Sequence, residues 1–247
     1  MILLVDIGNS RIKAAQWRDG EIVHCTACAH RRRFSQAMLD QCWGDLPVPA
    51  QVWIANVAGA QAAAVVEQWI EAHWGCAVHF VCTRARQLGV SNAYLQPDRL
   101  GVDRWMGLIA CRQTERVPAI IVNCGTALTI DVIDAEGRHL GGYLAPGLKT
   151  QRDSLCTSTE IVLRDTGGEP LLELACDTEK AIIRGTLYSI VSLINQSANQ
   201  LTKKYSVDFS RVITGGEAPA IIPFLEGDWL HQPALVLAGI GHVMQSA

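Results

Sequence analysis

The sequence has no long apolar run and no excess of basic residues. No stretch of 18 or more residues is uninterruptedly apolar, so no membrane-spanning helix is predicted. The formal net charge is −3, and the one basic run, Arg31–Arg33, is typical of the solvated start of a helix. Neither nucleic acid nor a membrane is therefore expected as a partner. The segment Met1–Asp6 has no basic residues, so a secretory signal peptide is not expected and we predict a cytoplasmic protein.

The cysteines do not form a recognisable metal or disulfide framework. There are 9 of them, an odd number, and several lie inside apolar runs, namely Cys76, Cys82, Cys111 and Cys124. This pattern predicts reduced thiols in the core of a cytosolic protein. Cys25 and Cys28 form a single CxxC pair with no second pair to complete a zinc site, so a metal or redox role is the minor alternative for them.

What the sequence does have is a repeated arrangement of strands. Apolar residues make up 49% of the 247 residues, enough for one large domain or two small ones with their own cores. A strand, a glycine-containing turn, a strand, a turn and a strand occur from residue 2 and again from residue 119. We interpret these as two copies of one supersecondary unit. Their boundary is expected near residues 115–118, where Arg116-Val117-Pro118 interrupts the pattern.

The remaining elements are predicted from hydrophobic periodicity. Strands are predicted at residues 51–55 and 78–82, between and after helical patterns. The predicted helices cover residues 34–43, 60–74, 98–115, 177–203 and 234–246. A loop is expected around Gly167, Gly168 and Pro170.

The first turn of the repeat has the residues of a phosphate-binding loop. In Asp6–Lys13, Gly8 permits a left-handed backbone, and the small side chains beside it leave backbone amides open to an anion. Asp6 can hold magnesium through water, and Lys13 or Arg11 can answer phosphate charge. The same residues also suit a plain hairpin, because Asn, Gly and Ser are ordinary turn residues.

A matching turn in the second copy favours the phosphate interpretation. The segment Asn123–Asp131 again places a glycine and a hydroxyl residue, Gly125 and Thr126, between two strands. A third glycine site, Thr214–Glu217, suits the close approach of a flat ring such as adenine, although a simple strand-to-helix turn explains it equally well. None of these is a P-loop, because neither GxxxxGK[ST] nor GxGxxG occurs.

Together these segments resemble a known superfamily, that of acetate and sugar kinases, heat-shock chaperones and actin. Within it the chain is similar to the type III pantothenate kinases, which include the Bvg accessory factor proteins. The resemblance covers nearly the whole chain and is specific through the order of its motifs. These are Asp6–Lys13, Gly101–Arg104, Gly125-Thr126, Gly141–Gly147, Thr178–Ile182 and Thr214–Gly216.

The resemblance implies a fold and a reaction. The fold is two ribonuclease H-like α/β domains of the actin-like ATPase architecture, at residues 1–116 and 117–247, with a nucleotide cleft between them. The reaction is the ATP-dependent phosphorylation of pantothenate to 4'-phosphopantothenate, the first step of coenzyme A biosynthesis. Magnesium accompanies ATP, and the family forms homodimers with the active site at the interface.

The resemblance also implies roles for individual residues. Asp103 is the expected general base. ATP is expected to bind at Asp6, Ile7, Gly8, Asn9, Ser10, Arg11, Ile12, Lys13 and Thr126. Pantothenate is expected to bind at Tyr94, Gly101, Val102, Asp103, Arg104 and, from the partner subunit, Thr178.

The acceptor segment supports this from its residues. Asp98 is a possible cap for a helix whose first turns carry Gly101, Asp103 and Arg104. Trp105, Leu108 and Ile109 are expected to form its buried side. Small residues such as Gly107 lie on the same face as Asp103 and would leave room for a ligand. They would equally well permit close helix packing.

One departure from the family concerns a monovalent cation. Many members use an Asp at the start of the second phosphate loop to bind potassium or ammonium, whereas this chain has Asn123. We therefore expect weak cation binding or none, unless a nearby carbonyl or carboxylate holds the ion. Two alternatives for the whole protein remain open, another small-molecule kinase of the superfamily and a non-catalytic ATP-binding regulatory protein.

Overall fold

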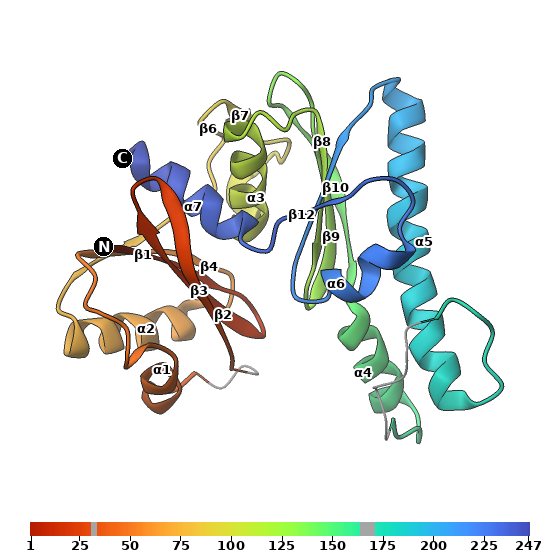
Figure 1. Ribbon diagram of the computed structural model, residues 1–247, viewed down its shortest axis with the longest axis horizontal. Coiled ribbons are helices and arrows are strands. Elements are labelled where there is room, and N and C mark those ends of the chain that lie inside the picture. Colours follow the sequence, from red (N-terminus) through yellow and green to blue (C-terminus); the bar gives the residue numbers. More distant parts are fainter. Residues whose placement is uncertain (31–33, 164–170) are drawn as a thin grey trace. The chain divides into compact units, whose positions relative to one another are not determined.

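The computed structural model describes residues 1–30, 34–163 and 171–247, which divide into two compact units (Figure 1). Unit 1 contains residues 1–116, 136–139 and 234–247, and unit 2 contains residues 117–135 and 140–233. The basic run at residues 31–33 and the loop predicted around residues 167–170 lie outside the described residues. The assignment of domains to residues 1–116 and 117–247 stays a prediction. In the described part of the chain, no helix is both long and apolar enough to cross a lipid bilayer.

Unit 1 is a five-stranded sheet with helices on both faces. Its elements are β1 (Ile2–Ile7), β2 (Arg11–Arg18), β3 (Glu21–Ala29), α1 (Gln36–Trp43), β4 (Gln51–Asn56), α2 (Ala60–His73), β5 (Ala77–Phe80), β6 (Arg86–Gln87), β7 (Val90–Ser91), the short 3-10 helix η1 (Pro97–Arg99), α3 (Val102–Gln113) and α7 (Leu235–Gln245). The strand order is β3-β2-β1-β4-β5. β1 and β2 are antiparallel, and β1 and β4 are parallel.

Unit 2 repeats this sheet order. Its elements are β8 (Ala119–Cys124), β9 (Ala127–Ile133), β10 (His139–Pro146), α4 (Leu148–Ser158), α5 (Thr178–Tyr205), β11 (Ser210–Thr214), α6 (Ala218–Ile221), the 3-10 helix η2 (Ile222–Phe224) and β12 (Leu230–His231). The order β10-β9-β8-β11-β12 matches that of unit 1 element by element. The predicted duplication is therefore confirmed, and the predicted α/β class with it.

Alternate side chains along the strands of unit 1 point to opposite faces of the sheet, and both faces are buried. On β1, Leu3, Val5 and Ile7 belong to the core under α1 and α2. Leu4 and Asp6 point to the opposite face, against which α3 and α7 pack. β1 is buried almost throughout, as expected for a central strand covered on both sides.

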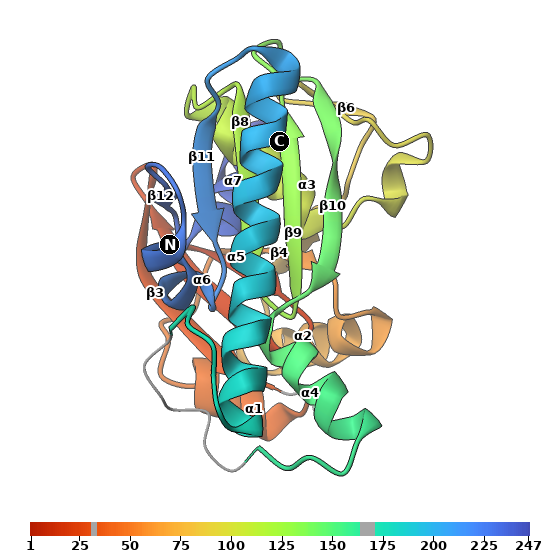
Figure 2. The same ribbon diagram turned by 90° about the vertical axis from the view of Figure 1, so that its right-hand side faces the viewer.

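Unit 2 has its core between the sheet and α5. Apolar residues of β8 and β9 pack with Leu187, Ile190 and Ile194 of α5. Figure 2 shows α5 running along the sheet, with α4 beside its first turns. α5 begins at Asp177, whose side chain accepts a hydrogen bond from the Lys180 N–H and so caps the helix.

The predicted start of the acceptor helix was wrong by four residues. Asp98 lies in η1 and is not the cap of α3, because Leu100 is extended, Gly101 is not helical and α3 begins at Val102. The helix is also buried on more sides than expected, with every residue from Trp105 to Cys111 inaccessible. Burial of Gly107 in this run favours close helix packing over a space for a ligand.

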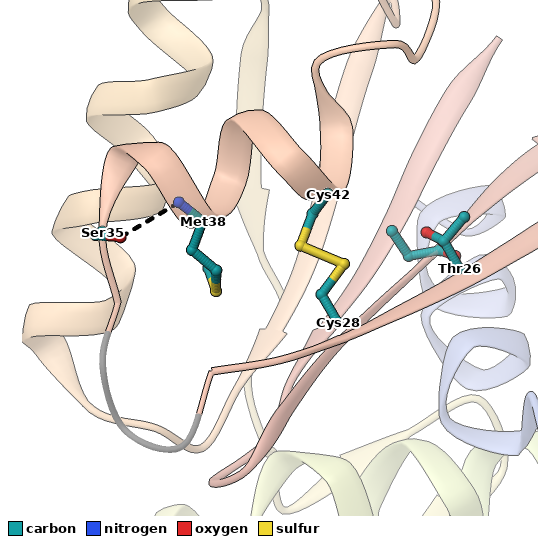
Figure 3. Close-up of a disulfide and its surroundings, with 6 residues drawn as sticks. Thr26, Cys28, Ser35, Met38 and Cys42 are labelled. Carbon is teal, nitrogen blue, oxygen red and sulfur yellow. Dashed lines mark hydrogen bonds between the residues drawn. A yellow bond between two sulfur atoms is a disulfide. The ribbon is translucent and has the colours of Figure 1, made fainter.

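The expectation that all cysteines are reduced was also wrong. Cys28 near the end of β3 and Cys42 in α1 form a disulfide, with their Cα atoms 6.1 Å apart (Figure 3). It ties the last turn of α1 to the sheet, and at the other end of this helix the Ser35 side chain accepts a hydrogen bond from the Met38 N–H. Of the thiols expected in the core, Cys111 and Cys124 are buried but Cys82 is exposed.

Candidate active site

The hairpin between β1 and β2 places Asp6 and Lys13 directly opposite each other. They are paired in the antiparallel register, so their side chains emerge on the same face of the sheet. Ile7 and Ile12 point to the other face and are fully buried in the core. Any contact of these two isoleucines with ATP would therefore involve their backbone.

The tip of this hairpin consists of Gly8, Asn9, Ser10 and Arg11. The Gly8 N–H donates to the Arg11 carbonyl over 3.0 Å. Asn9, Ser10 and Arg11 are exposed, as a loop that receives phosphate must be. The structure shows a further contact that the sequence did not predict. His30, which is buried after β3, has its Nε2 2.9 Å from the Gly8 carbonyl oxygen.

Asp6 is an unusual carboxyl group. Its pKa is raised from 3.8 to about 7, chiefly by burial and also by the Asp103 carboxylate, while the Lys13 ammonium opposes the rise. Asp103 is 97 positions away in the sequence, so the fold brings a second carboxyl group close to the first. A buried acid with a strongly shifted pKa beside a second acid and a lysine marks a candidate functional site.

Asp103 lies in the first turn of α3. Its Oδ1 accepts a hydrogen bond from the Arg104 N–H over 2.8 Å. A side chain on Gly101 would put a Cβ 2.6 Å from that oxygen, so any other residue here would displace the carboxylate from its position over the helix start. The positive end of the helix favours the ionised carboxylate there. Val102 is buried, so any contact of this residue with a ligand would involve its backbone.

Tyr94 and Arg104, both predicted to bind the substrate, are in contact. Arg104 Nη1 donates to the Tyr94 hydroxyl over 3.1 Å. The Tyr94 N–H donates to Asn92 Oδ1 over 2.9 Å, which fixes the loop. The Tyr94 ring also stacks on buried His139, with ring centroids 6.1 Å apart. His139 comes from the start of β10, and no local sequence signal indicated this contact.

In unit 2, three glycine turns lie against one another. A Cβ on Gly147 would collide with the Gly125 carbonyl, and one on Gly215 would collide with the backbone of Cys124. The Gly147 N–H donates to the Thr126 carbonyl over 3.0 Å, and Thr150 Oγ1 donates to the same oxygen over 2.6 Å. The second and third glycine sites predicted from the sequence therefore form one cluster.

Glu217 joins this cluster to α4. Its Oε2 accepts from the Leu148 N–H over 2.9 Å and its Oε1 from the Lys149 N–H over 3.1 Å. Its own N–H donates to the Cys124 carbonyl over 3.0 Å. Glu217 thus caps a helix 69 positions away in the chain, a role that its local sequence did not indicate.

The other predicted residues of unit 2 lie at element ends. Thr126 is exposed between β8 and β9, and Thr178 is exposed in the first turn of α5. Asn123 is the fifth residue of β8 and Asp6 the fifth of β1. Asn123 therefore occupies in unit 2 the place that Asp6 occupies in unit 1.

The residues of unit 1 fit magnesium held with a nucleotide. Among the described residues, no group of three or more His, Cys, Asp and Glu side chains could enclose a metal ion. Magnesium bound with nucleotides needs only one or two carboxylates and keeps several waters. The adjacent carboxyl groups of Asp6 and Asp103 meet that requirement.

Comparison of the sequence with known proteins gives consistent relatives. The model of a family described as type III pantothenate kinase matches residues 2–200. A type III pantothenate kinase of Nitrosococcus oceani is 40% identical over 248 residues, covering 98% of this chain and 93% of the relative. One of Alcanivorax borkumensis is 33% identical over 243 residues, covering 98% of each chain.

Comparison with solved structures bears on the fold. A conserved Baf family protein from Campylobacter jejuni matches with a TM-score of 0.61 at 19% identity, covering 99% of this chain and 98% of that one. The activator of the 2-hydroxyisocaproyl-CoA dehydratase from Clostridium difficile, with bound ADPNP, matches with a TM-score of 0.52 at 11% identity, covering 97% and 91%. These likenesses confirm the expected actin-like ATPase architecture.

Proposed function

The chain belongs to the type III pantothenate kinase family, and from this premise we propose that Asp103 is the general base of its reaction. The protein is an ATP-dependent kinase that converts pantothenate to 4'-phosphopantothenate, at the start of coenzyme A biosynthesis. The observation that supports the choice of residue is the proximity of Asp103, Asp6 and Lys13 in unit 1.

On the donor side, we assign ATP binding to the hairpin Asp6–Lys13 and, as the family resemblance implies, to Thr126. Backbone amides and the Lys13 ammonium bind the phosphates and neutralise part of their charge. Phosphoryl transfer depends on this neutralisation and on positioning. When bound with ATP, magnesium neutralises further phosphate charge. Asp6 is the residue that would hold it through its hydration shell, since its side chain emerges on the same face as Lys13.

The acceptor side is formed by the start of α3 and the loop before it. The hydroxyl oxygen of pantothenate attacks the γ-phosphorus, the bond to ADP breaks, and Asp103 takes the hydroxyl proton. Arg104 offers a two-pronged donor for the carboxylate of pantothenate. The hydrogen bond from Arg104 to the Tyr94 hydroxyl supports this role, because it holds the guanidinium in a fixed orientation.

A homodimer would complete the site. We assign Thr178 to the pantothenate site of the neighbouring subunit, as the family resemblance implies. Exposed large side chains in unit 2 support a subunit interface there. Tyr143 and Leu144 on β10 are 53% and 68% exposed, and Tyr188 on α5 is 58% exposed.

The test is ADP release, measured with and without pantothenate. Pantothenol, which carries a hydroxyl in place of the carboxylate, serves as the matched second acceptor. We expect ADP release to require an acceptor and the wild type to prefer pantothenate. We expect Arg104→Gln to lose most of that preference. ADP release that ignores pantothenate would contradict the proposed reaction, and an unchanged preference in Arg104→Gln would contradict the role of Arg104 alone.

A further inference from the structure

His30 follows β3 and lies against the tip of the β1–β2 hairpin. Its backbone N–H donates to the Ser10 carbonyl over 3.1 Å. Its ring Nε2 lies 2.9 Å from the Gly8 carbonyl oxygen. Because a carbonyl oxygen only accepts hydrogen bonds, Nε2 carries a proton and is the donor. One residue therefore binds two carbonyls of the phosphate loop.

The Gly8 carbonyl of this turn is bound by a side chain and not by the backbone of the turn. In a closely paired two-residue hairpin, the flanking residues exchange both backbone hydrogen bonds. Here the Gly8 N–H donates to the Arg11 carbonyl. In the described part of the chain the return bond from the Arg11 N–H to the Gly8 carbonyl is not found, and the imidazole of His30 bonds to that carbonyl. The turn is thus held by a side chain from another strand.

This arrangement matters for an anion. Phosphate oxygens are acceptors, so a phosphate loop works only if its amides face the ligand and its carbonyls face away. His30 engages the carbonyls of Gly8 and Ser10, so both carbonyls point towards His30. A turn closed by its own backbone would instead use the Arg11 N–H internally.

The imidazole is itself firmly held. His30 is 4% exposed, and its ring packs on Phe34 with centroids 4.0 Å apart. The bond from the imidazole to the half-buried Gly8 carbonyl contributes to holding the turn, so loss of the imidazole would allow the turn to rearrange.

We propose that His30 is a positioning residue for ATP. It does not touch the nucleotide but fixes the carbonyls of the phosphate loop so that the loop amides can bind phosphate. The inference rests on the proposed ATP-binding role of Asp6–Lys13.

The test compares three substitutions. His30→Gln places an amide nitrogen near the position of Nε2, whereas the amide of His30→Asn is too short to reach the Gly8 carbonyl. His24→Asn is the matched control. His24 is exposed on β3, the strand that precedes His30, with φ 51°, a backbone conformation that asparagine tolerates. We expect His30→Asn to raise the KM for ATP about tenfold, the scale of one lost hydrogen bond. His30→Gln and His24→Asn should stay within about twofold of wild type, as should the KM for pantothenate in all three.

Equilibrium binding of a non-hydrolysable ATP analogue, without pantothenate, separates this inference from the proposed function. If the wild type binds the analogue and folded His30→Asn binds it equally well, His30 has no positioning role. If His30→Gln is as weak as His30→Asn, the hydrogen bond is not what matters. Wild type that binds the analogue without phosphorylating pantothenate would contradict the proposed reaction alone. Wild type that binds no analogue would overturn the loop assignment and this inference together.

A second measurement avoids a buried substitution. The imidazole ¹⁵N spectrum of the wild type, with the His30 signals identified by their loss in His30→Gln, should show a slowly exchanging Nε2–H. Its chemical shift should change when the ATP analogue binds. A ring protonated only on Nδ1, or a signal that ignores the nucleotide, would overturn the proposal.

Discussion

The smallest scale at which the mechanism can be tested is the side chain of Asp103. Asp103→Asn keeps the shape of the residue and its acceptor oxygen towards the Arg104 N–H but removes the base. We expect turnover to fall by about 100-fold or more, the usual scale for a positioned base, while ATP-analogue binding stays nearly intact. The control is Asp19→Asn, in an exposed turn where φ is 52°. Near-normal turnover in Asp103→Asn would remove this residue from the mechanism.

Asp6 makes stability depend on pH in a direction opposite to that of an ordinary paired carboxylate. Its folded pKa of about 7 lies above its ordinary value of 3.8, so the folded chain keeps a proton that the unfolded chain releases. This contribution is fully present below pH 3.8 and is lost as pH rises through about 7. Between about pH 5 and pH 8, the unfolding free energy of the wild type should fall by roughly 2 kcal/mol more than that of Asp6→Asn, because the variant cannot ionise at this position.

The measurement is urea unfolding without magnesium or nucleotide. Tryptophan fluorescence reports chiefly on unit 1, because 6 of the 7 tryptophans lie there. Asp103→Asn is the informative companion. Without the repelling carboxylate, the pKa of Asp6 should fall and the pH dependence should move to lower pH. Parallel pH profiles for wild type and Asp6→Asn would contradict the prediction.

Asn123 should make the enzyme indifferent to monovalent cations. It stands at the position of β8 that Asp6 holds in β1. The family resemblance implies an Asp at this position as the ligand of the ion, and this chain has a neutral amide there. For a weakly held cation, ligand charge matters. Activity titrated with potassium in tetramethylammonium-balanced, sodium-free buffer should change little, and Asn123→Asp should gain a dependence. A steep, saturable potassium response of the wild type would show that another oxygen ligand holds the ion.

At the scale of elements, local sequence patterns predicted most of the fold. The β1–β2 and β8–β9 hairpins were found because runs such as Ile120–Val122 are apolar and each turn has a glycine. α4 was missed because Leu148 is its only residue buried in the described structure, so it has no apolar stripe to recognise. Its start depends on Glu217, a contact that no local window contains.

The same reason explains the missing parts of the site. The motifs located Asp6, Asp103 and Tyr94. They did not locate His30, which bonds to the Gly8 carbonyl, or His139, which stacks on Tyr94 from the start of β10. A buried histidine beside a turn has no signature of spacing or composition. Its role comes from the pairing of strands, which only the folded chain reveals.

The cap that Glu217 provides should control the order of α4. Glu217→Ala removes the acceptor for the Leu148 and Lys149 amides, a loss of about 1–2 kcal/mol to the first turn. Hydrogen exchange followed by mass spectrometry should show that the backbone amides of residues 148–151 exchange at least several-fold faster in this variant than in the wild type. Exposed Glu160, just after the same helix, gives the control Glu160→Ala. Equal exchange in the two variants would mean that α4 does not need the cap.

At the scale of the whole molecule, the proposed dimer predicts complementation. If Thr178 completes the pantothenate site of the neighbouring subunit, Asp103→Asn and Thr178→Ala spoil contributions from different chains to one site. Heterodimers of the two then contain one site without either lesion. A mixture should therefore recover activity that neither variant has alone. With random exchange of equal amounts, about half the dimers are mixed, and each of these has one intact site out of two. The activity per chain should therefore approach one quarter of that of the wild type. No recovery after confirmed subunit exchange would exclude a shared site.

The placement of α7 has a consequence for how the protein is made. Unit 1 is encoded mostly by residues 1–116, yet its sheet packs against the last helix of the chain. A Cβ on Gly239 would collide with the Met106 backbone, and Gly241 lies against Trp17, so α7 fits tightly into this face. At typical synthesis rates the ribosome needs roughly ten seconds to reach α7 after residue 116. During that time, the face of the unit 1 sheet that α7 covers stays exposed. We therefore expect chaperones to bind the nascent chain at this apolar face before α7 is synthesised.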